Sequence, residues 1–402
     1  MIDKNKKYVL FHPGPVHHFF FIPIGLLWTI LKKNEVILLI DETYKENPYF
    51  LKIKKLPGIK EVIFIEENNS IKNYLKLKKI ITKVLSDYSF SEIYTHNPAF
   101  VPCYALAFLS KKYQPDAKRI YFQVAREVSS YPNEAKVKLN ILIDNFRYKS
   151  LPFVVKKNII LLFVSFKFFI VFKFLPLLTY GVAFAPWQNP YYPSKSYINN
   201  FIKKGFCLDG NDETIFFDEK VLDYTNNFFR GATFKLAKPF LEENHKEIYS
   251  YFFNQSPNIV PTISIFPTWG VSNKNLEEKW LNIIHKLRNY YKNHKIQIKF
   301  HPGVKDSYIE DIFIKVSKTV SNIEILPRDT PAFKMVIDSS IIIGDTSSVL
   351  WLGTHFKNKT IYSLDVFNLF DGDCLKIYSD KLNYIDDIKK LDLLQSHNFY
   401  IP

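Results

Sequence analysis

The clearest chemical signal in the sequence is His301, which follows the strand-like run Ile296 to Phe300 and precedes Pro302. In a parallel sheet, the carboxyl ends of the strands form the edge at which ligands bind. The proline turns the chain there, so the imidazole can face a ligand, donate to a phosphate oxygen or protonate a leaving group. A His-Pro pair taken alone is more often a structural histidine that ends a strand.

A hydroxyl-rich turn, Asp345 to Ser348, follows the short apolar run Ile341 to Ile343 and leads into a helix-compatible stretch. The first turn of a helix has unpaired backbone N–H groups and a partial positive charge. Together with serine and threonine hydroxyls, these groups can bind an anion. Without a second signal, the same residues are explained as an ordinary helix cap.

Three motifs occur in order in the second half of the chain: Phe266-Pro267-Thr268-Trp269, Lys299-Phe300-His301-Pro302 and Gly344-Asp345-Thr346-Ser347-Ser348. In this order and at these distances they resemble the second domain of bacterial CDP-glycerol glycerophosphotransferases. The His-Pro and Ser-Ser elements are also similar to those of bacterial sialyltransferases and polysialyltransferases. The resemblance covers roughly residues 260 to 370. It implies a GT-B fold, in which two Rossmann-like domains face each other across a cleft, and a nucleotide-activated donor.

The resemblance also implies a role for each matching residue. His301 would contact the donor phosphate and support departure of the nucleotide, and Thr268 would stand near the same phosphates. Hydroxyl and backbone donors to the phosphate would come from Thr346, Ser347 and Ser348. Because basic groups and a helix end would neutralise the phosphates, we expect no cofactor and no required metal. The absence of both Gly-rich phosphate-binding motifs from the sequence fits this class.

The transferred group needs an acceptor, and a base must take the proton from the attacking hydroxyl. The stretch Ala125 to Tyr131 is similar to an acidic segment of the sialyltransferases but lacks its acidic pair, which leaves Glu127 as the nearest carboxylate. The turn after the first predicted strand offers His17 instead, since a histidine titrates near neutrality. Packing or helix capping explains His17 equally well, and His96 has the same claim with less support.

The elements that must position these residues alternate between short apolar runs and longer helix-compatible stretches, which is typical of parallel sheets covered by helices. The chain has 402 residues, enough for two domains. We predict an acceptor-side domain over residues 1–235 and a nucleotide-binding domain over 236–402. Predicted strands of the first are Tyr8 to Phe11, Glu35 to Ile40, Glu61 to Ile65, Glu92 to Thr95, Arg119 to Phe122 and the run GVAFAPW. Predicted elements of the second are Thr262 to Phe266, a helix from Leu276 to Tyr291, Ile296 to Phe300, a helix from Ser307 to Val320, Ile323 to Leu326, Ala332 to Asp338, Ile341 to Ile343 and Thr360 to Leu364. A helix from about Lys235 to Phe253 could bridge the domains.

The net charge of +15 indicates an anionic partner. The lysines are dispersed and no nucleic-acid-binding module is present, so nucleic acid is not the expected partner. Cys103, Cys207 and Cys374 lie far apart, without a Cys-x-x-Cys pair or a histidine at ligand spacing. This spacing predicts neither a zinc site nor a disulfide framework.

Residues 151–180 are predicted to associate with a membrane. Ile159 to Tyr180 is a run of 22 residues in which only Lys167 and Lys173 are charged. We expect an interfacial helix whose lysines reach anionic headgroups. A buried helix and a membrane-spanning helix are the alternatives. The N-terminus carries no signal-peptide pattern, so the expected location is cytoplasmic, on the inner face of the cell membrane.

These observations predict a transferase of surface-polymer assembly. It would move a glycosyl or polyol-phosphate group from a cytidine-nucleotide donor to a surface-polysaccharide or lipid-linked acceptor. CMP-sialic acid-dependent sialyl or polysialyl transfer is the first alternative. A nucleotide-sugar epimerase and a catalytically inactive GT-B membrane adaptor are alternatives of other classes.

Overall fold

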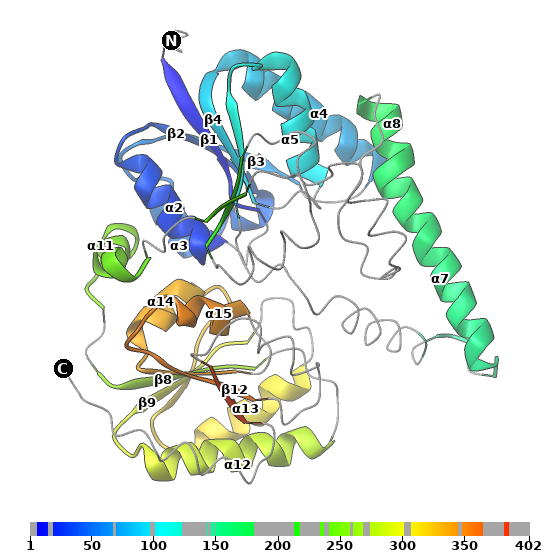
Figure 1. The fold of residues 1–402 in the computed structure, drawn as a ribbon. Coiled ribbons are helices and arrows are strands. Elements are labelled where there is room, and N and C mark those ends of the chain that lie inside the picture. The colour runs from blue at the N-terminus through cyan, green and yellow to red at the C-terminus, as the bar shows by residue number, and fades with distance from the viewer. Residues whose placement is uncertain are drawn as a thin grey trace. The chain divides into compact units, whose positions relative to one another are not determined.

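The chain forms two compact units, Met1–Lys238 and Pro239–Pro402 (Figure 1). The structure is a computed structural model. It describes residues 6–14, 19–66, 70–96, 101–122, 143, 146–148, 150–180, 213–217, 234–236, 241–257, 260–267, 274–300, 307–344, 348–364 and 382–385.

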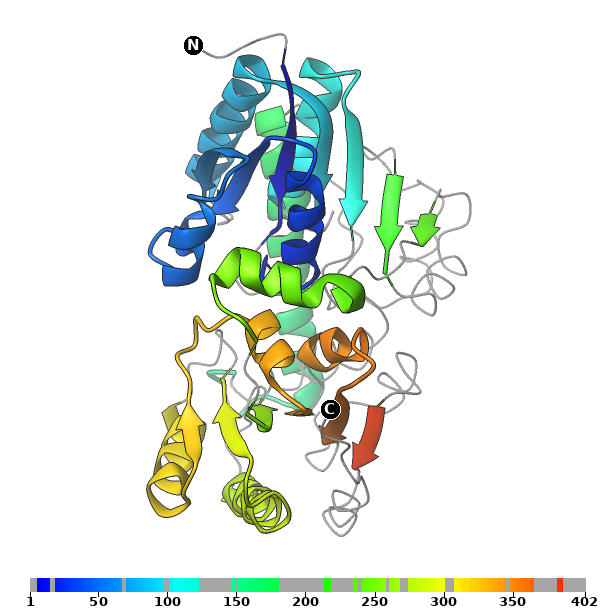
Figure 2. The ribbon, with the colours of Figure 1, turned by 90° about the vertical axis from the view of Figure 1, so that its left-hand side faces the viewer.

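The first unit contains a seven-stranded parallel sheet with strand order β3-β2-β1-β4-β5-β6-β7. Its inner strands form because apolar runs such as VILLID are buried along their whole length. The strands are β1 (Lys7–His12), β2 (Val36–Asp41), β3 (Ile59–Ile65), β4 (Ser89–Thr95), β5 (Lys118–Phe122), β6 (Glu213–Phe216) and β7 (Phe234–Leu236). Figure 2 shows the green strands β6 and β7 beside the cyan β5.

Helices cover both faces of this sheet. Helices α4 (Ile71–Asp87) and α5 (Val101–Tyr113) pack on one face, where their apolar side chains join Tyr8 and Leu10 in one buried cluster. Helix α4 begins where the Ser70 hydroxyl accepts from the Asn73 N–H. The shorter helices are α2 (Ile22–Leu31) and α3 (Pro48–Ile53), with a single 3₁₀ turn, η1 (Glu42–Tyr44), between β2 and α3.

The second unit contains a six-stranded parallel sheet with strand order β10-β9-β8-β11-β12-β13. Its strands are β8 (Thr262–Phe266), β9 (Lys295–Ile298), β10 (Ile323–Ile325), β11 (Ile341–Gly344), β12 (Thr360–Leu364) and β13 (Leu382–Ile385). Its helices are α11 (Leu241–Phe253), α12 (Lys274–Tyr290), α13 (Ser307–Thr319), α14 (Ala332–Asp338) and α15 (Ser348–Thr354). Apolar side chains of α12 and α13 form a core with one face of the sheet. The predicted fold class, α/β with two Rossmann-like sheets, is thereby confirmed.

Several boundaries differ from the sequence prediction. The helix predicted from about Lys235 begins at Leu241, because Phe234–Leu236 pairs with β6 as an edge strand. The sequence analysis did not predict the strands β6 and β13. The predicted strand GVAFAPW lies outside the described residues.

Residues 153–180 form one long helical rod. It consists of α7 (Phe153–Phe169), a π-helical turn η2 (Ile170–Phe174) and α8 (Leu175–Tyr180). The end of the rod is fixed to α4: the Lys78 ammonium donates to Thr179 O at 2.6 Å, and the Tyr180 hydroxyl donates to Tyr74 O at 3.2 Å. Within the part of the chain that the structure describes, no helix is both long and apolar enough to cross a membrane.

Candidate functional site

All three sequence motifs of the second unit leave the same edge of its sheet. The first follows β8, the second follows β9 and the third follows β11, and these strands are neighbours in the order β9-β8-β11. The chain builds one half of the sheet outward from β8 and then returns to place β11 on the other side of β8. Such a reversal opens a crevice at the carboxyl ends of the two central strands, where doubly wound folds bind ligands.

The strand ends at this edge are aligned with one another. Phe266 is opposite Gly344, and Ile265 is opposite Ile298. The N–H of Lys299 continues the pairing by donating to Ile265 O at 3.0 Å. A side chain on Gly344 would bring its Cβ to 3.1 Å from Phe266 O, so the backbones approach closely where the third motif starts.

Lys299 is a buried cation at this edge and is 8% exposed. Its neighbours in sequence, Ile298 and Phe300, belong to the apolar core, so the alternation of a strand directs Lys299 to the opposite face. Burial lowers the pKa of Lys299 to about 8, and the Asp329 carboxylate offsets part of that effect. The sequence analysis quoted this lysine only as part of a motif. A buried ammonium beside three strand ends can attract an anion and compensate its negative charge.

Most of the predicted site residues themselves lie outside the described residues. This holds for Thr268, His301, Thr346 and Ser347, which follow the three strands, and for the candidate bases His17 and Glu127. Ser348 is the first residue of α15. This helix has only seven residues, so its dipole is short.

The first unit has the same reversal at its own sheet. Its central strands are β1 and β4, and each ends next to a histidine: His12 is the last residue of β1, and His96 follows Thr95 at the end of β4. Both imidazoles are fully buried. Their ring centroids are 5.6 Å apart at nearly perpendicular planes.

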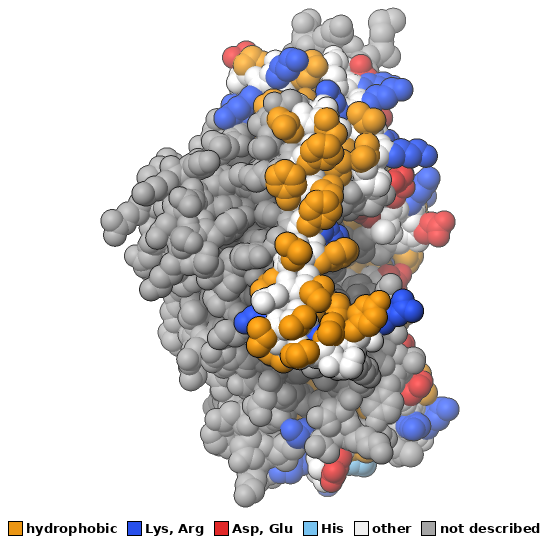
Figure 3. Space-filling model, turned by 90° about the vertical axis from the view of Figure 1, so that its right-hand side faces the viewer, with side chains coloured by type: hydrophobic (Ala, Val, Ile, Leu, Met, Phe, Trp, Pro, Cys, Tyr) orange, Lys and Arg blue, Asp and Glu red, His pale blue; other side chains and the backbone are white. Residues whose placement is uncertain are grey.

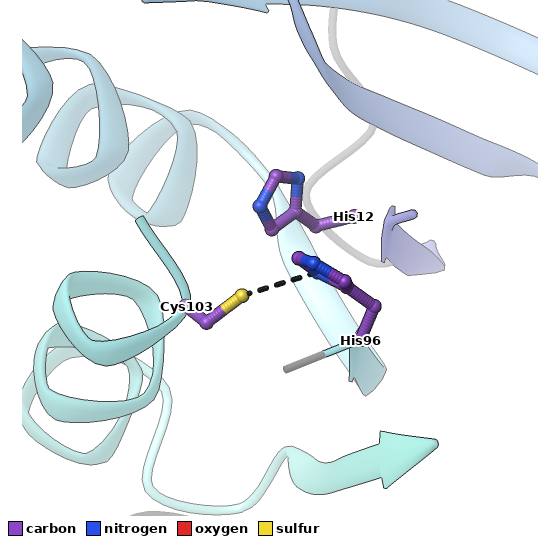
Figure 4. A group of neighbouring side chains, drawn as sticks. All are labelled: His12, His96 and Cys103. Atoms are coloured by element: carbon purple, nitrogen blue, oxygen red, sulfur yellow. Dashed lines mark hydrogen bonds between the residues drawn. The ribbon is translucent and has the colours of Figure 1, made fainter. Parts of the chain in front are cut away.

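A thiol completes this group (Figure 4). Cys103, in the first turn of α5, places Sγ 3.4 Å from His96 Nδ1. One nitrogen or sulfur atom of each of the three side chains lies within 4.8 Å of the others. The spacing of cysteines and histidines in the sequence did not reveal this group, because only the pairing of β1 with β4 brings its members together.

Two backbone features hold the histidines in place. The His12 Nδ1–H donates to Leu39 O at 2.8 Å, since a carbonyl oxygen can only accept. Gly14 lies against the His96 ring at φ +85°, and a Cβ at this position would come within 2.2 Å of His96 Cε1 and Nε2. Burial lowers the pKa of His12 to about 4, which keeps the imidazole neutral at physiological pH.

A scan against protein-family models gives no match, and no curated protein matches the chain. Among solved structures, the chain is similar to the UDP-GlcNAc 2-epimerase from Methanocaldococcus jannaschii, with 13% identity and a TM-score of 0.48 over 96% of this chain and 91% of that chain. It is also similar to the wall teichoic acid polymerase TagF in complex with CDPG, with 12% identity and a TM-score of 0.49 over 98% and 79% of the two chains. A glycosyltransferase from Rickettsia africae ESF-5 gives 13% identity and a TM-score of 0.45 over 96% and 88%. At these identities the likeness concerns the fold alone.

Proposed function

We propose that this chain is a GT-B-type transferase that binds a nucleotide-activated donor at the carboxyl edge of the second sheet. The observation that carries the proposal is that the three sequence motifs begin at the carboxyl ends of the adjacent, aligned strands β9, β8 and β11. Donor phosphates at this edge would meet the buried ammonium of Lys299. The His-Pro and Ser-Ser residues that follow the strands would supply hydrogen-bond donors.

The proposed donor is a cytidine nucleotide, from which a glycosyl or polyol-phosphate group moves to a surface-polysaccharide or lipid-linked acceptor. The acceptor hydroxyl attacks, cytidine monophosphate leaves, and a base takes the hydroxyl proton. In this proposal His301 contacts the donor phosphate together with Ser347 and Ser348. His17 or Glu127 takes the proton. The reaction uses no required metal, because Lys299 and the donors of the motifs compensate the phosphate charge.

A nucleotide-binding screen tests the donor proposal directly. CMP or CDP is expected to raise the melting temperature of the full chain, because a ligand that binds only the folded state stabilises it. His301→Ala, and Ser347→Ala combined with Ser348→Ala, are expected to weaken binding by about tenfold or more, since a lost hydrogen bond to a charged oxygen costs roughly 1.5–3 kcal/mol. His285→Ala is the matched control, because His285 is an exposed histidine on α12.

The same screen, together with two activity assays, separates the alternative functions. Stabilisation by UDP or GDP alone would contradict a cytidine donor, and full affinity in the two motif variants would contradict the site. Release of free sugar from a nucleotide sugar without an acceptor would favour an epimerase. Transfer from CMP-sialic acid would favour the sialyltransferase alternative. An inactive adaptor predicts that none of the nucleotides binds.

We also propose that the helical rod docks on an anionic bilayer, which would locate the protein on the inner face of the cell membrane. Hydrophobic side chains form a continuous stripe along the rod (Figure 3). The most exposed of them are Leu162 and Phe163, at 74% and 70%. Other exposed members of the stripe are Phe153, Val154, Ile159, Phe166 and Phe169. So much contiguous apolar surface is unusual on a protein that stays in water.

The charges support a lipid partner of negative charge. Lys157 and Lys167 lie exposed on α7, and the whole chain carries a net charge of +15. Lysines beside an inserted apolar face can reach the headgroups of anionic lipids.

Sedimentation with phosphatidylglycerol vesicles tests the docking. The full chain is expected to bind at low salt and to be released by salt, because screening weakens the lysine attraction. Phe163→Glu with Phe166→Glu is expected to reduce binding by more than tenfold, since each inserted phenylalanine contributes about 1.5–3 kcal/mol. Leu75→Glu is the control, because Leu75 is also an exposed apolar residue, at 55%, but lies on α4. Absence of wild-type binding at low salt would rule out the docking surface.

A further inference from the structure

We propose that His12, His96 and Cys103 form a binding site for one divalent transition-metal ion, with Zn²⁺ as the physiological ion. The site lies inside the first unit and does not depend on the proposed transfer reaction. Its three side chains come from the end of β1, the end of β4 and the first turn of α5. Imidazole nitrogen and thiolate sulfur are the ligands that zinc prefers in proteins.

The distances fit one ion with small adjustments. Zinc bonds of about 2.0–2.3 Å place two ligand atoms of a tetrahedral site roughly 3.3–3.6 Å apart. His96 Nδ1 and Cys103 Sγ are already 3.4 Å apart. All three side chains offer a ligand atom within 4.8 Å of the others, so the widest pair must close by at most about 1.2–1.5 Å.

The surroundings of His12 have the form expected around a metal ligand. Its Nδ1–H donates to Leu39 O at 2.8 Å, which fixes the orientation of the ring and leaves the lone pair on Nε2. Metal-binding histidines commonly donate their second ring N–H to a backbone carbonyl in this way. Figure 4 shows the rings of His12 and His96 and the sulfur of Cys103 converging from three separate elements.

Gly14 makes room for the second histidine. Its lack of a side chain allows the backbone to lie against the His96 ring at a φ of +85°. The imidazole is therefore held between this backbone on one side and Cys103 on the other.

The depth of the site defines how the ion enters and what it does. His12 and His96 are 0% exposed and Cys103 is 2% exposed, so the ion binds as the chain folds. Binding exchanges the thiol proton, which passes to solvent, for a sulfur–zinc bond. The three protein ligands leave one position of a tetrahedral ion for a water molecule. The bound ion would tie β1, β4 and α5 together at the point where the sheet reverses.

Cobalt substitution of the full chain tests the site. Protein produced with Co²⁺ in place of Zn²⁺ is expected to contain one ion per chain and to show a thiolate-to-cobalt charge-transfer band. Cys103→Ser is expected to lose the band and to reduce the metal content more than tenfold. The double variant Cys207→Ser with Cys374→Ser is the matched control, since it removes both other cysteines and is expected to keep the ion and the band.

Two results would overturn the proposal. One is a folded wild-type chain, checked by circular dichroism, that holds neither zinc nor cobalt after refolding with an equimolar amount of either ion. The other is a charge-transfer band that survives Cys103→Ser or disappears in the double variant. Because the stoichiometry and the double variant are informative by themselves, the test remains valid even if Cys103→Ser does not fold.

Discussion

The two units place different chemistry at the same topological position. In each sheet the chain reverses beside its first strand, between β1 and β4 in one unit and between β8 and β11 in the other. The first reversal point holds the buried group of His12, His96 and Cys103, proposed above as metal ligands. The second holds a buried cation and the starting points of three polar motifs.

The comparison teaches that topology specifies where side chains meet but not what they do. A glycine lies at each reversal point, and the two glycines have different roles. Gly14 adopts a left-handed conformation and makes room for an imidazole, whereas Gly344 lets two strand backbones approach. We therefore expect the stability of the first unit to fall when a side chain is added at its reversal point. For the second unit, we expect stability and ligand binding to respond to a change of charge at its reversal point.

The largest expected effect is that of Gly14→Ala. The new Cβ would overlap the His96 ring, and the positive φ disfavours any L-residue with a side chain. Strain of about 1–3 kcal/mol and overpacking of about 1–3 kcal/mol together predict a loss of roughly 2–6 kcal/mol in unfolding free energy. Urea denaturation monitored by circular dichroism measures this loss.

Gly58→Ala is the matched control for that prediction. Gly58 has nearly the same φ, +86°, but its added Cβ would meet only the end of the Leu31 side chain, at 3.0 Å. It is expected to cost about 1–3 kcal/mol, the backbone strain alone. Equal losses at both glycines would show that contact with His96 contributes nothing.

The next effect is that of Lys299→Met, which is expected to stabilise the second unit and weaken nucleotide binding. Burial lowers the pKa of Lys299 from 10.5 to about 8, so below pH 8 the folded chain holds an unfavourable buried charge. Between about pH 8 and 10.5 the unfolded chain binds a proton that the folded chain has released, and wild-type stability rises with pH. The variant should therefore gain about 3 kcal/mol at pH 7, and this gain should shrink towards pH 10.5.

Lys295→Met is the control on the same strand. Lys295 forms a surface ion pair with Glu324 at 2.7 Å, and such pairs contribute little to stability. Thermal unfolding of both variants from pH 7 to 10 measures the pH dependence of stability. Nucleotide titration of the same variants measures their affinity. A Lys299→Met protein with unchanged nucleotide affinity would separate this lysine from the proposed donor site.

Gly344→Ala is expected to have a smaller effect on stability. Its Cβ would approach Phe266 O at 3.1 Å without a strained φ, and a shift of a few tenths of an ångström would relieve the contact. We expect a loss of about 1 kcal/mol, at the lower end of overpacking effects. Urea denaturation of Gly344→Ala and Gly14→Ala in parallel compares the two losses of unfolding free energy. Equal losses would contradict the expected difference between the two reversal points.

The smallest effect concerns the buried contact between the hydroxyls of Ser264, on β8, and Ser339, which follows α14. The Ser339 hydroxyl donates to Met335 O at 2.6 Å, so the Ser264 hydroxyl is the donor in its 2.5 Å contact with Ser339. Ser264→Ala is expected to lower the unfolding free energy by about 1 kcal/mol. Ser317→Ala, at a more exposed position on α13, should change it by less, and the reverse order would contradict this assignment.

The sequence predicted the strands well where burial is complete. Runs such as Val36–Asp41 and Ile341–Gly344 are apolar throughout, so their pattern identifies an inner strand without further information. The strands β6 and β13 were not predicted, because ETIF and LNYI are short and are flanked by polar residues. β13 lies at the edge of its sheet and β6 next to the edge strand β7, and such strands owe their pairing to their neighbours more than to their own composition.

The candidate sites were predictable to different degrees. The edge of the second sheet followed from local signals, because each motif directly continues a recognisable strand. The His12, His96 and Cys103 group did not, since its members are brought together by the order of strands, which spacing along the chain does not reveal. Burial of Lys299 was equally hidden, because a lysine at a strand end is usually exposed.

The π-helical turn η2 has a consequence for the direction in which the apolar stripe points. Each residue of an α-helix rotates the side-chain direction by roughly 100°, and a π-turn accommodates an additional residue. The turn Ile170–Phe174 thus sets the angle between the face of α8 that packs on α4 and the outward face of α7. Deleting one residue here would swing the stripe by about a quarter of a circle with the composition almost unchanged. One additional residue in the π-helical turn therefore determines the direction in which the apolar stripe faces.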